Sequence, residues 1–193
     1  SASTHTPPAH MNIALDIGHT QGRIQPNGVD EHQLAATVAA ALAETLRQAG
    51  HSVQTVDFPH LGNSADLTKT AAAINTAAPH ISISLHADWS DNPAAKGAHV
   101  CHYPGSAKGK RLAACIAAHL TAPDLLPGRA DKTVPRGDLY ILRATKCPAV
   151  LVECGFMGNA HDLDILRNSP HRIAAAITHG VEDYAKDLAN RQS

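Results

Sequence analysis

The sequence predicts a single α/β domain built on a mostly parallel, twisted central sheet of about six strands, with helices on its flanks. Apolar runs typical of strands alternate along the chain with stretches of helical periodicity, which is the pattern of such a sheet. The chain has 193 residues, which is enough for one domain with a sizeable core. No repeat or internal linker interrupts the alternation, and no apolar run approaches the length of a membrane span.

The first half of the chain supplies three strands and two helices. Every second residue is apolar over residues 12–17, which predicts a strand. Asp30 is then a plausible N-cap, and apolar residues recur every four positions until Gly50, which predicts an amphipathic helix. By the same patterns a strand, a helix and a short strand are expected over residues 51–58, 65–78 and 81–85.

The second half continues the alternation. A strand, a helix and an irregular loop rich in Gly and Pro are expected over residues 98–103, 107–120 and 125–137. The last two strands are expected over residues 139–142 and 149–152. The second of these is a continuous apolar run between Pro148 and Gly155, which indicates a buried strand. A helix over residues 170–188 closes the chain.

Composition excludes several classes of function. The net charge of −1 gives no basic surface for nucleic acid and none for an anionic membrane. The four cysteines form no Cys-x-x-Cys pair, which disfavours a structural zinc site and leaves both disulfides and buried thiols open. Residues 1–10, rich in Ser, Thr, Pro and His, are expected to be a disordered leader, followed by the domain over residues 11–193.

Side chains of metal-ligand type lie at the ends of the predicted strands. His19, His86 and Glu153 each follow a predicted strand, and Glu31 opens the first long helix. Because the carboxyl ends of parallel strands form the ligand crevice of open α/β sheets, we expect these side chains to converge. Two imidazoles and a carboxylate suit zinc, so His19, Glu31 and His86 are candidate ligands. Glu153 is then the candidate acid and base of a hydrolytic reaction.

Each of these residues also has a purely structural interpretation. His19 suits a turn that is hydrogen-bonded to backbone, and His86 suits the end of a strand. Glu31 is favoured in the first turn of a helix by the macrodipole alone. A charge at the end of a strand, such as Glu153, can also turn into the following loop.

The residues belong to motifs that occur in a recognisable order. These are LDIGH at 15–19, Glu31 at a helix start, SISLHAD at 82–88 and PAVLVECGFMGN at 148–159. Over residues 12–188 this order resembles the zinc-dependent N-acetylmuramoyl-L-alanine amidases that cleave bacterial peptidoglycan. The resemblance implies zinc binding by His19, Glu31 and His86 and acid/base catalysis by Glu153. The bond cut would be the amide between the lactyl group of N-acetylmuramic acid and L-alanine of the stem peptide.

Substrate contacts are expected from charged residues before Glu153. Arg129, Arg136 and Arg143 suit bidentate pairing with a stem-peptide carboxylate, although solvated surface arginines are an equal alternative. Asp88, where the family usually has Asn, is a further candidate. A second group of ligand-type side chains is better explained as core thiols and surface histidines: His99, Cys101, His102, Cys115 and His119.

Two other functions fit the same residues. One is a zinc peptidase that cuts within the stem peptide, and the other is a catalytically inactive wall-binding module. We expect a monomer that acts on peptidoglycan in the periplasm or at the extracellular face, with no nucleic-acid or membrane partner. No signal peptide is visible, so export by a cleaved signal or release of the phage type is expected, as for a small remodelling enzyme or an endolysin.

Overall fold

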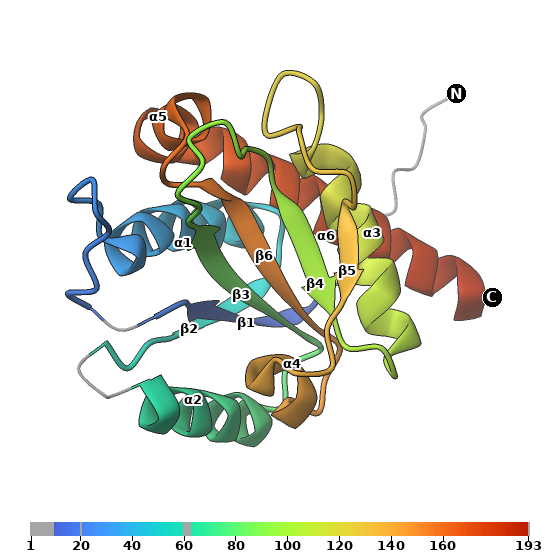
Figure 1. Ribbon diagram of the computed structural model, residues 1–193. Coiled ribbons are helices and arrows are strands. Elements are labelled where there is room, and N and C mark those ends of the chain that lie inside the picture. The colour runs from blue at the N-terminus through green and yellow to red at the C-terminus, as the bar shows by residue number, and fades with distance from the viewer. Residues whose placement is uncertain (1–9, 20, 60–62, 193) are drawn as a thin grey trace.

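A computed structural model of the protein describes residues 10–19, 21–59 and 63–192. It confirms the predicted fold, a six-stranded, mostly parallel sheet with helices on both faces (Figure 1). The expected leader lies outside the described residues except for His10. Within the described residues no helix is long and apolar enough to cross a bilayer.

The strands lie in the order β2-β1-β3-β6-β4-β5. Their bounds are Asn12–Ile17 (β1), Ser52–Val56 (β2), Ile81–Asp88 (β3), His99–His102 (β4), Thr133–Pro135 (β5) and Ala149–Phe156 (β6). β2, β1, β3 and β6 are parallel, whereas β4 runs antiparallel to β6 and β5 runs parallel to β4. The carboxyl ends of β1, β3 and β6 therefore meet at one edge of the sheet.

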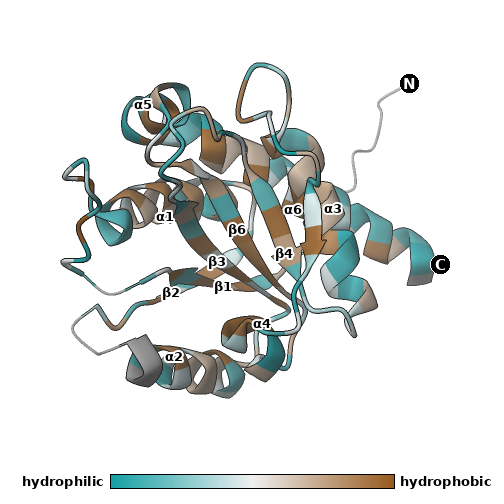
Figure 2. Cartoon of the chain, in the orientation of Figure 1, coloured by the Kyte–Doolittle hydropathy of each residue, from teal (hydrophilic) through white to brown (hydrophobic). Residues whose placement is uncertain are grey.

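The two faces of the sheet are covered unequally (Figure 1). One face packs against α1 (Glu31–Gln48), α3 (Ala107–Leu120), α5 (Ala160–Asn168) and α6 (Pro170–Gln192). The other face packs against α2 (Asn63–Ala77) and the short α4 (Tyr140–Ala144). Figure 2 shows the central strands largely in hydrophobic colours, while the end of α6 is hydrophilic. The apolar cluster under α2 and α4 is the smaller of the two, so part of this face of the sheet is free for polar side chains.

Strand periodicity decides which residues point to that less covered face. In β3, Ile83 and Leu85 enter the large apolar cluster, so Ser84 and His86 point the other way. In β6, Val152 and Cys154 belong to the large cluster, so Glu153 shares a face with His86. Both side chains therefore lie over the part of the sheet that the helices leave open.

The helix that delivers Glu31 begins as predicted. The Asp30 side chain accepts a hydrogen bond from the backbone N–H of Gln33, which satisfies a free donor of the first turn. Leu34, Val38, Leu42 and Leu46 are among the residues that α1 buries. The N-cap thus sets the register in which Glu31, the first helical residue, faces the sheet.

The prediction of a strand over residues 139–142 is wrong, because this segment forms most of α4. The two neighbours of β6 are β3 and β4, so no edge beside β6 is free for another strand. Ile141 and Leu142 instead pack on the smaller apolar cluster. The sixth strand is β5, which lies inside the predicted loop over residues 125–137.

A further helix, α5, was not predicted. Its N-cap Asn159 accepts a hydrogen bond from the backbone N–H of Asp162. β3 and β6 also extend beyond their predicted ends, so His86 and Glu153 lie inside strands rather than after them. Inside the strands, parallel pairing places His86 directly beside Glu153.

Candidate metal centre and catalytic cavity

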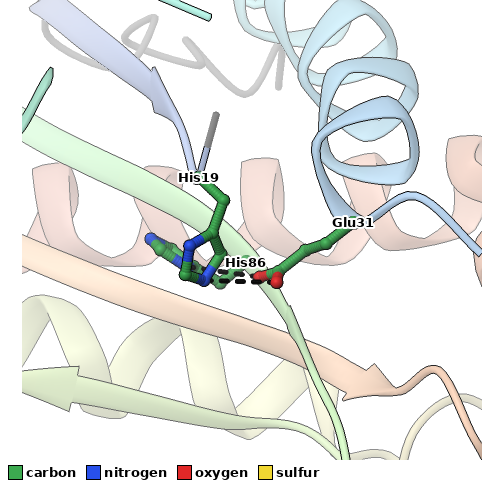
Figure 3. A group of neighbouring side chains, drawn as sticks. All are labelled: His19, Glu31 and His86. Carbon is green, nitrogen blue, oxygen red and sulfur yellow. Dashed lines mark ion pairs between the residues drawn. The ribbon is translucent and has the colours of Figure 1, made fainter. Parts of the chain in front are cut away.

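Three of the predicted site residues converge at the carboxyl edge of the sheet (Figure 3). Their ligand-type atoms all lie within 4.8 Å of one another. His19 Nε2 is 3.2 Å from Glu31 Oε2, and His86 Nδ1 is 3.5 Å from Glu31 Oε1. The two imidazole rings meet edge to face, with centroids 5.1 Å apart. Both rings therefore present a nitrogen to the same carboxylate.

The loop after β1 holds His19 against His86. The Gly18 N–H donates to the Leu85 carbonyl at 2.8 Å, which ties this loop to β3. A Cβ on Gly18 would lie only 2.5 Å from Cε1 of His86, so only glycine allows this approach. His19 itself has a φ of 59°, in the left-handed region that non-glycine residues seldom adopt. Such local strain is found mainly where a side chain must be aimed at a site.

Glu31 is 4% exposed and is held by more than its helix. Its Oε1 accepts a hydrogen bond from the backbone N–H of Ala87 at 3.3 Å. The positive end of the α1 dipole further stabilises the carboxylate. Glu31 therefore presents a fixed negative charge to both histidines.

The two histidines differ in their outer contacts. Arg23 Nη1 lies 3.3 Å from Nδ1 of His19, and because arginine can only donate, this contact leaves the proton of a neutral ring on Nε2. A cation at Nε2 would displace that proton and break the exposed contact. On His86, by contrast, the outer nitrogen Nε2 lies 3.1 Å from the hydroxyl of Ser84.

Acidic groups in and around the cluster favour a positive charge on His86. Burial opposes the charged form of His86, but the hydrogen bond to Glu31 and the charges of Glu153 and Asp16 raise its pKa to about 9. Burial lowers the pKa of His19 below its ordinary value. The carboxylates thus stabilise a positive charge at this position, and a bound cation would be stabilised by them in the same way as a proton on His86.

Glu153 lies beside the cluster, because the pairing of β3 and β6 places it next to His86. Its Oε2 is buried and has no hydrogen-bond partner among the described residues. Burial raises the pKa of Glu153 to about 7, against the lowering effect of His86 and with the aid of Asp88 and Glu31. A buried carboxylate oxygen without a partner is costly, so this atom fits a ligand or a water better than an empty environment.

The site opens into a cavity of about 360 Å³. One wall is polar and includes His19, His86 and Glu153. The apolar part of the lining comes from α2, from α4 with its N-cap residue, and from β6: Leu67, Leu139, Tyr140, Ile141 and Leu151. The cavity therefore combines ionisable groups with a surface suited to apolar parts of a substrate.

Of the residues expected to contact substrate, Asp88 and Arg136 line this cavity. Arg136 forms a bidentate pair with Asp138, with both distances 2.7 Å. Arg129 does not line the cavity; it pairs with Asp88 at 3.0 Å and lies 4.1 Å above the ring of Phe156.

Arg143 is exposed and also lies off the cavity, with its guanidinium 5.6 Å from the ring centroid of Tyr140. Arg129 is thus held by structural contacts and Arg143 faces solvent. Arg136 remains the arginine of the three that is placed to meet a ligand in the cavity.

The second group of ligand-type side chains is divided by the sheet. His99 and Cys101 line the cavity, whereas His119 lies on α3 and pairs with Asp183 of α6 at 2.6 Å. Within the described residues, no group besides His19, Glu31 and His86 brings ligand atoms this close together. All four cysteines are free thiols. The interpretation of this group as core thiols and surface histidines holds only in part. Cys101 is a buried thiol and His119 is partly exposed, but His102 is buried.

Sequence reasoning missed two polar residues behind the site, Asp16 and Ser84. The signal was present: Ser84 precedes His86 by two positions, so the period of a strand puts both on one face. Asp16 is likewise buried and lies opposite Ser84 in the register of β1 and β3. Placing Asp16 behind His86 required that register.

Two imidazoles and a carboxylate next to a half-buried glutamate form the arrangement typical of metal-dependent hydrolases on an α/β sheet. Residues 13–183 match the N-acetylmuramoyl-L-alanine amidase family, and the chain belongs to this family of peptidoglycan hydrolases. The match covers β1 through most of α6 and includes all four site residues.

Known proteins agree with this assignment. The chain is 28% identical over 173 residues to N-acetylmuramoyl-L-alanine amidase LytC of Bacillus subtilis, which covers 85% of this chain but 33% of LytC. The chain thus spans about a third of that relative.

Two solved structures share the fold along nearly their whole length. The CwlD amidase of Clostridioides difficile, solved in complex with the GerS lipoprotein, has a TM-score of 0.82 at 21% identity, covering 92% of this chain and 99% of that one. The catalytic domain of the CD27L endolysin, which targets Clostridia difficile, has a TM-score of 0.78 at 29% identity, covering 90% and 98%.

Proposed function

We propose that this domain uses zinc to hydrolyse the amide between the lactyl group of N-acetylmuramic acid and L-alanine of the peptidoglycan stem peptide. The observation that carries the proposal is the convergence of His19, Glu31 and His86 beside Glu153, whose Oε2 has no hydrogen-bond partner in the part of the chain that the structure describes. Membership of the amidase family supports the choice of bond. The donor set supports zinc, because zinc favours imidazole and carboxylate ligands with one position left for water.

The protein residues divide the work of the reaction. His19, Glu31 and His86 would hold the metal, which supplies a Lewis acid that lowers the pKa of water and polarises a carbonyl. Glu153, with a pKa of about 7, can accept a proton from the attacking water and then donate it to the leaving amine. A group whose pKa lies near neutral pH serves both steps.

The cavity walls support a peptide-like substrate. The apolar side chains of Leu67, Ile141 and Leu151 can cover the methyl groups of the lactyl unit and of L-alanine. Arg136 at the cavity can meet a carboxylate of the stem peptide by exchanging its pairing with Asp138. Peptidoglycan would then be the partner, reached at the wall-facing side of the membrane.

Analysis of digested peptidoglycan tests the proposal. We expect new amino groups on L-alanine, identified by mass spectrometry of the released fragments, and we expect zinc in the purified protein by elemental analysis. The Glu153→Gln variant is the matched control, because it keeps the size of the side chain but removes the base. New amino groups deeper in the stem peptide would indicate a peptidase instead, and wall binding without any cleavage would indicate a binding module.

A further inference from the structure

A short chain of polar groups runs behind His86, away from the proposed metal. Ser84 lies two residues before His86 on β3, and Asp16 lies beside Ser84 on β1. Both are buried, with exposures of 1% for Ser84 and 5% for Asp16. The Ser84 hydroxyl donates a short hydrogen bond to Oδ2 of Asp16, and Nε2 of His86 is 3.1 Å from the same hydroxyl oxygen.

The direction of these hydrogen bonds follows from the number of protons. A serine hydroxyl has one proton, and Ser84 gives it to Asp16. The Ser84 oxygen can then only accept from His86, so Nε2 of His86 carries a proton in both the charged and the neutral ring. Nδ1, which faces Glu31 at 3.5 Å, is therefore the nitrogen without a proton in the neutral ring, and its lone pair is free to bind a metal.

Asp16 is suited to the end of this chain. Although burial raises its pKa to about 6, at neutral pH it is mainly a carboxylate, which can accept hydrogen bonds but cannot donate them. Gly18 lies against the His86 ring and limits its rotation. The ring is thus fixed both in orientation and in the position of its outer proton.

We propose that Ser84 and Asp16 are positioning residues that hold His86 with its proton on Nε2 and its Nδ1 lone pair toward zinc. The inference rests on the proposed function and extends it to two residues that supply no metal ligand. Groups that hydrogen-bond the outer nitrogen of a metal-binding histidine fix its tautomer, and their loss lowers metal affinity about 10- to 100-fold. The outer contact of His19 that the described residues supply is with Arg23, which is exposed rather than buried.

Zinc affinity measured by chelator competition tests this role. Ser84→Ala should raise the dissociation constant by about 10- to 100-fold, whereas Ser84→Thr, which keeps the hydroxyl, should restore most of the affinity. Ser82→Ala is the matched control. Ser82 is also a buried serine on the same face of β3, but it lies two residues further along the strand from His86 than Ser84 does. It should leave zinc affinity unchanged.

A spectroscopic measurement separates positioning from a general loss of stability. In the zinc-loaded protein, long-range proton–nitrogen NMR spectra should show Nε2 of His86 protonated and its proton in slow exchange with water. Ser84→Ala should retain zinc at saturating concentration but lose this slow exchange. Melting temperatures of the metal-free variants control for folding.

A second variant keeps the test decisive if Ser84→Ala does not fold. Asp16→Asn keeps the size and an acceptor oxygen but not the charge, so it should weaken zinc binding more than Ser82→Ala and less than Ser84→Ala. Wild-type affinity in Ser84→Ala, or in Asp16→Asn if Ser84→Ala does not fold, would overturn the positioning role while leaving the proposed function in place. No zinc binding by the wild-type protein would overturn both.

Discussion

Gly18→Ala should damage the metal centre without touching a ligand. The added Cβ would lie 2.5 Å from Cε1 of His86, whereas carbon atoms pack at about 3.5–4.0 Å. The His86 ring or the loop carrying His19 must therefore move by about 1 Å. Metal ligands tolerate errors of only about 0.2 Å, and a misplacement of about 1 Å can cost about 100-fold in rate.

The structure also indicates how large the loss of stability should be. Gly18 does not have a positive φ, so alanine is compatible with its backbone and the effect comes from crowding alone. Overpacking of this kind costs about 1–3 kcal/mol. We therefore expect a folded variant with a lower melting temperature, a zinc dissociation constant raised at least tenfold and peptidoglycan hydrolysis reduced by about two orders of magnitude.

Zinc titration, thermal melting and a dye-release assay on labelled peptidoglycan measure these effects. Gly137→Ala is the matched control, because a Cβ there meets only Pro104 Cγ at 3.9 Å, an ordinary contact. If Gly18→Ala binds zinc and cleaves peptidoglycan as the wild type does, the contact between Gly18 and His86 does not position the ligand, and the reasoning fails.

The remaining predictions concern the catalytic base, a ligand, a buried carboxyl and the thiols. Glu153→Gln should keep zinc but lose about 10²- to 10⁴-fold in the rate of hydrolysis, whereas His86→Ala should lose zinc itself. Elemental analysis and the activity assay together distinguish the two results. Normal zinc content and normal activity in both variants would refute the proposed site. The pKa of Asp16 is raised from 3.8 to about 6, so protonation of Asp16 stabilises the metal-free folded state. This contribution to the free energy of unfolding is fully present below pH 3.8 and is lost as the pH rises through 6. Between pH 4 and 7, the stability of Asp16→Asn should therefore increase relative to that of the wild type, by about 3 kcal/mol at most in denaturant unfolding. If the difference in free energy of unfolding between the two proteins did not change with pH, the raised pKa of Asp16 would be contradicted. Burial raises the pKa of both Cys101 and Cys147 to about 11, so iodoacetamide should alkylate them slowly at pH 7.5 until the protein is unfolded; rapid labelling of the native protein would show otherwise.

Periodicity in the sequence predicted most of the sheet, because alternating and continuous apolar runs distinguish strands from amphipathic helices. It failed for residues 139–142, whose apolar side chains suit either a strand or a helical turn. The neighbours of β6 decide between the two, and those neighbours are set by long-range pairing. The antiparallel direction of β4 likewise depends on its connection across the sheet and is not encoded in local pattern.

For the site, the rule that strand ends meet brought His19, His86 and Glu153 into one region. The placement of Glu31 followed from its helix start, where Asp30 provides a recognisable cap. The rule could not separate Arg136, which lines the cavity, from Arg129 and Arg143, which do not. That distinction depends on the packing partners Asp88, Phe156 and Tyr140 rather than on position along the chain.

Because the helices cover the two faces of the sheet unequally, the residues that stabilise the fold and those that line the cavity lie largely on different faces. The larger apolar cluster, under α1, α3 and α6, holds the strands together on the side away from the cavity. The cavity wall is supplied in part by α4, a helix of only 5 residues that adds little to that cluster. Changes in this short helix can therefore alter which wall fragments are accepted while the molecule stays folded, so variation among enzymes of this design should concentrate there.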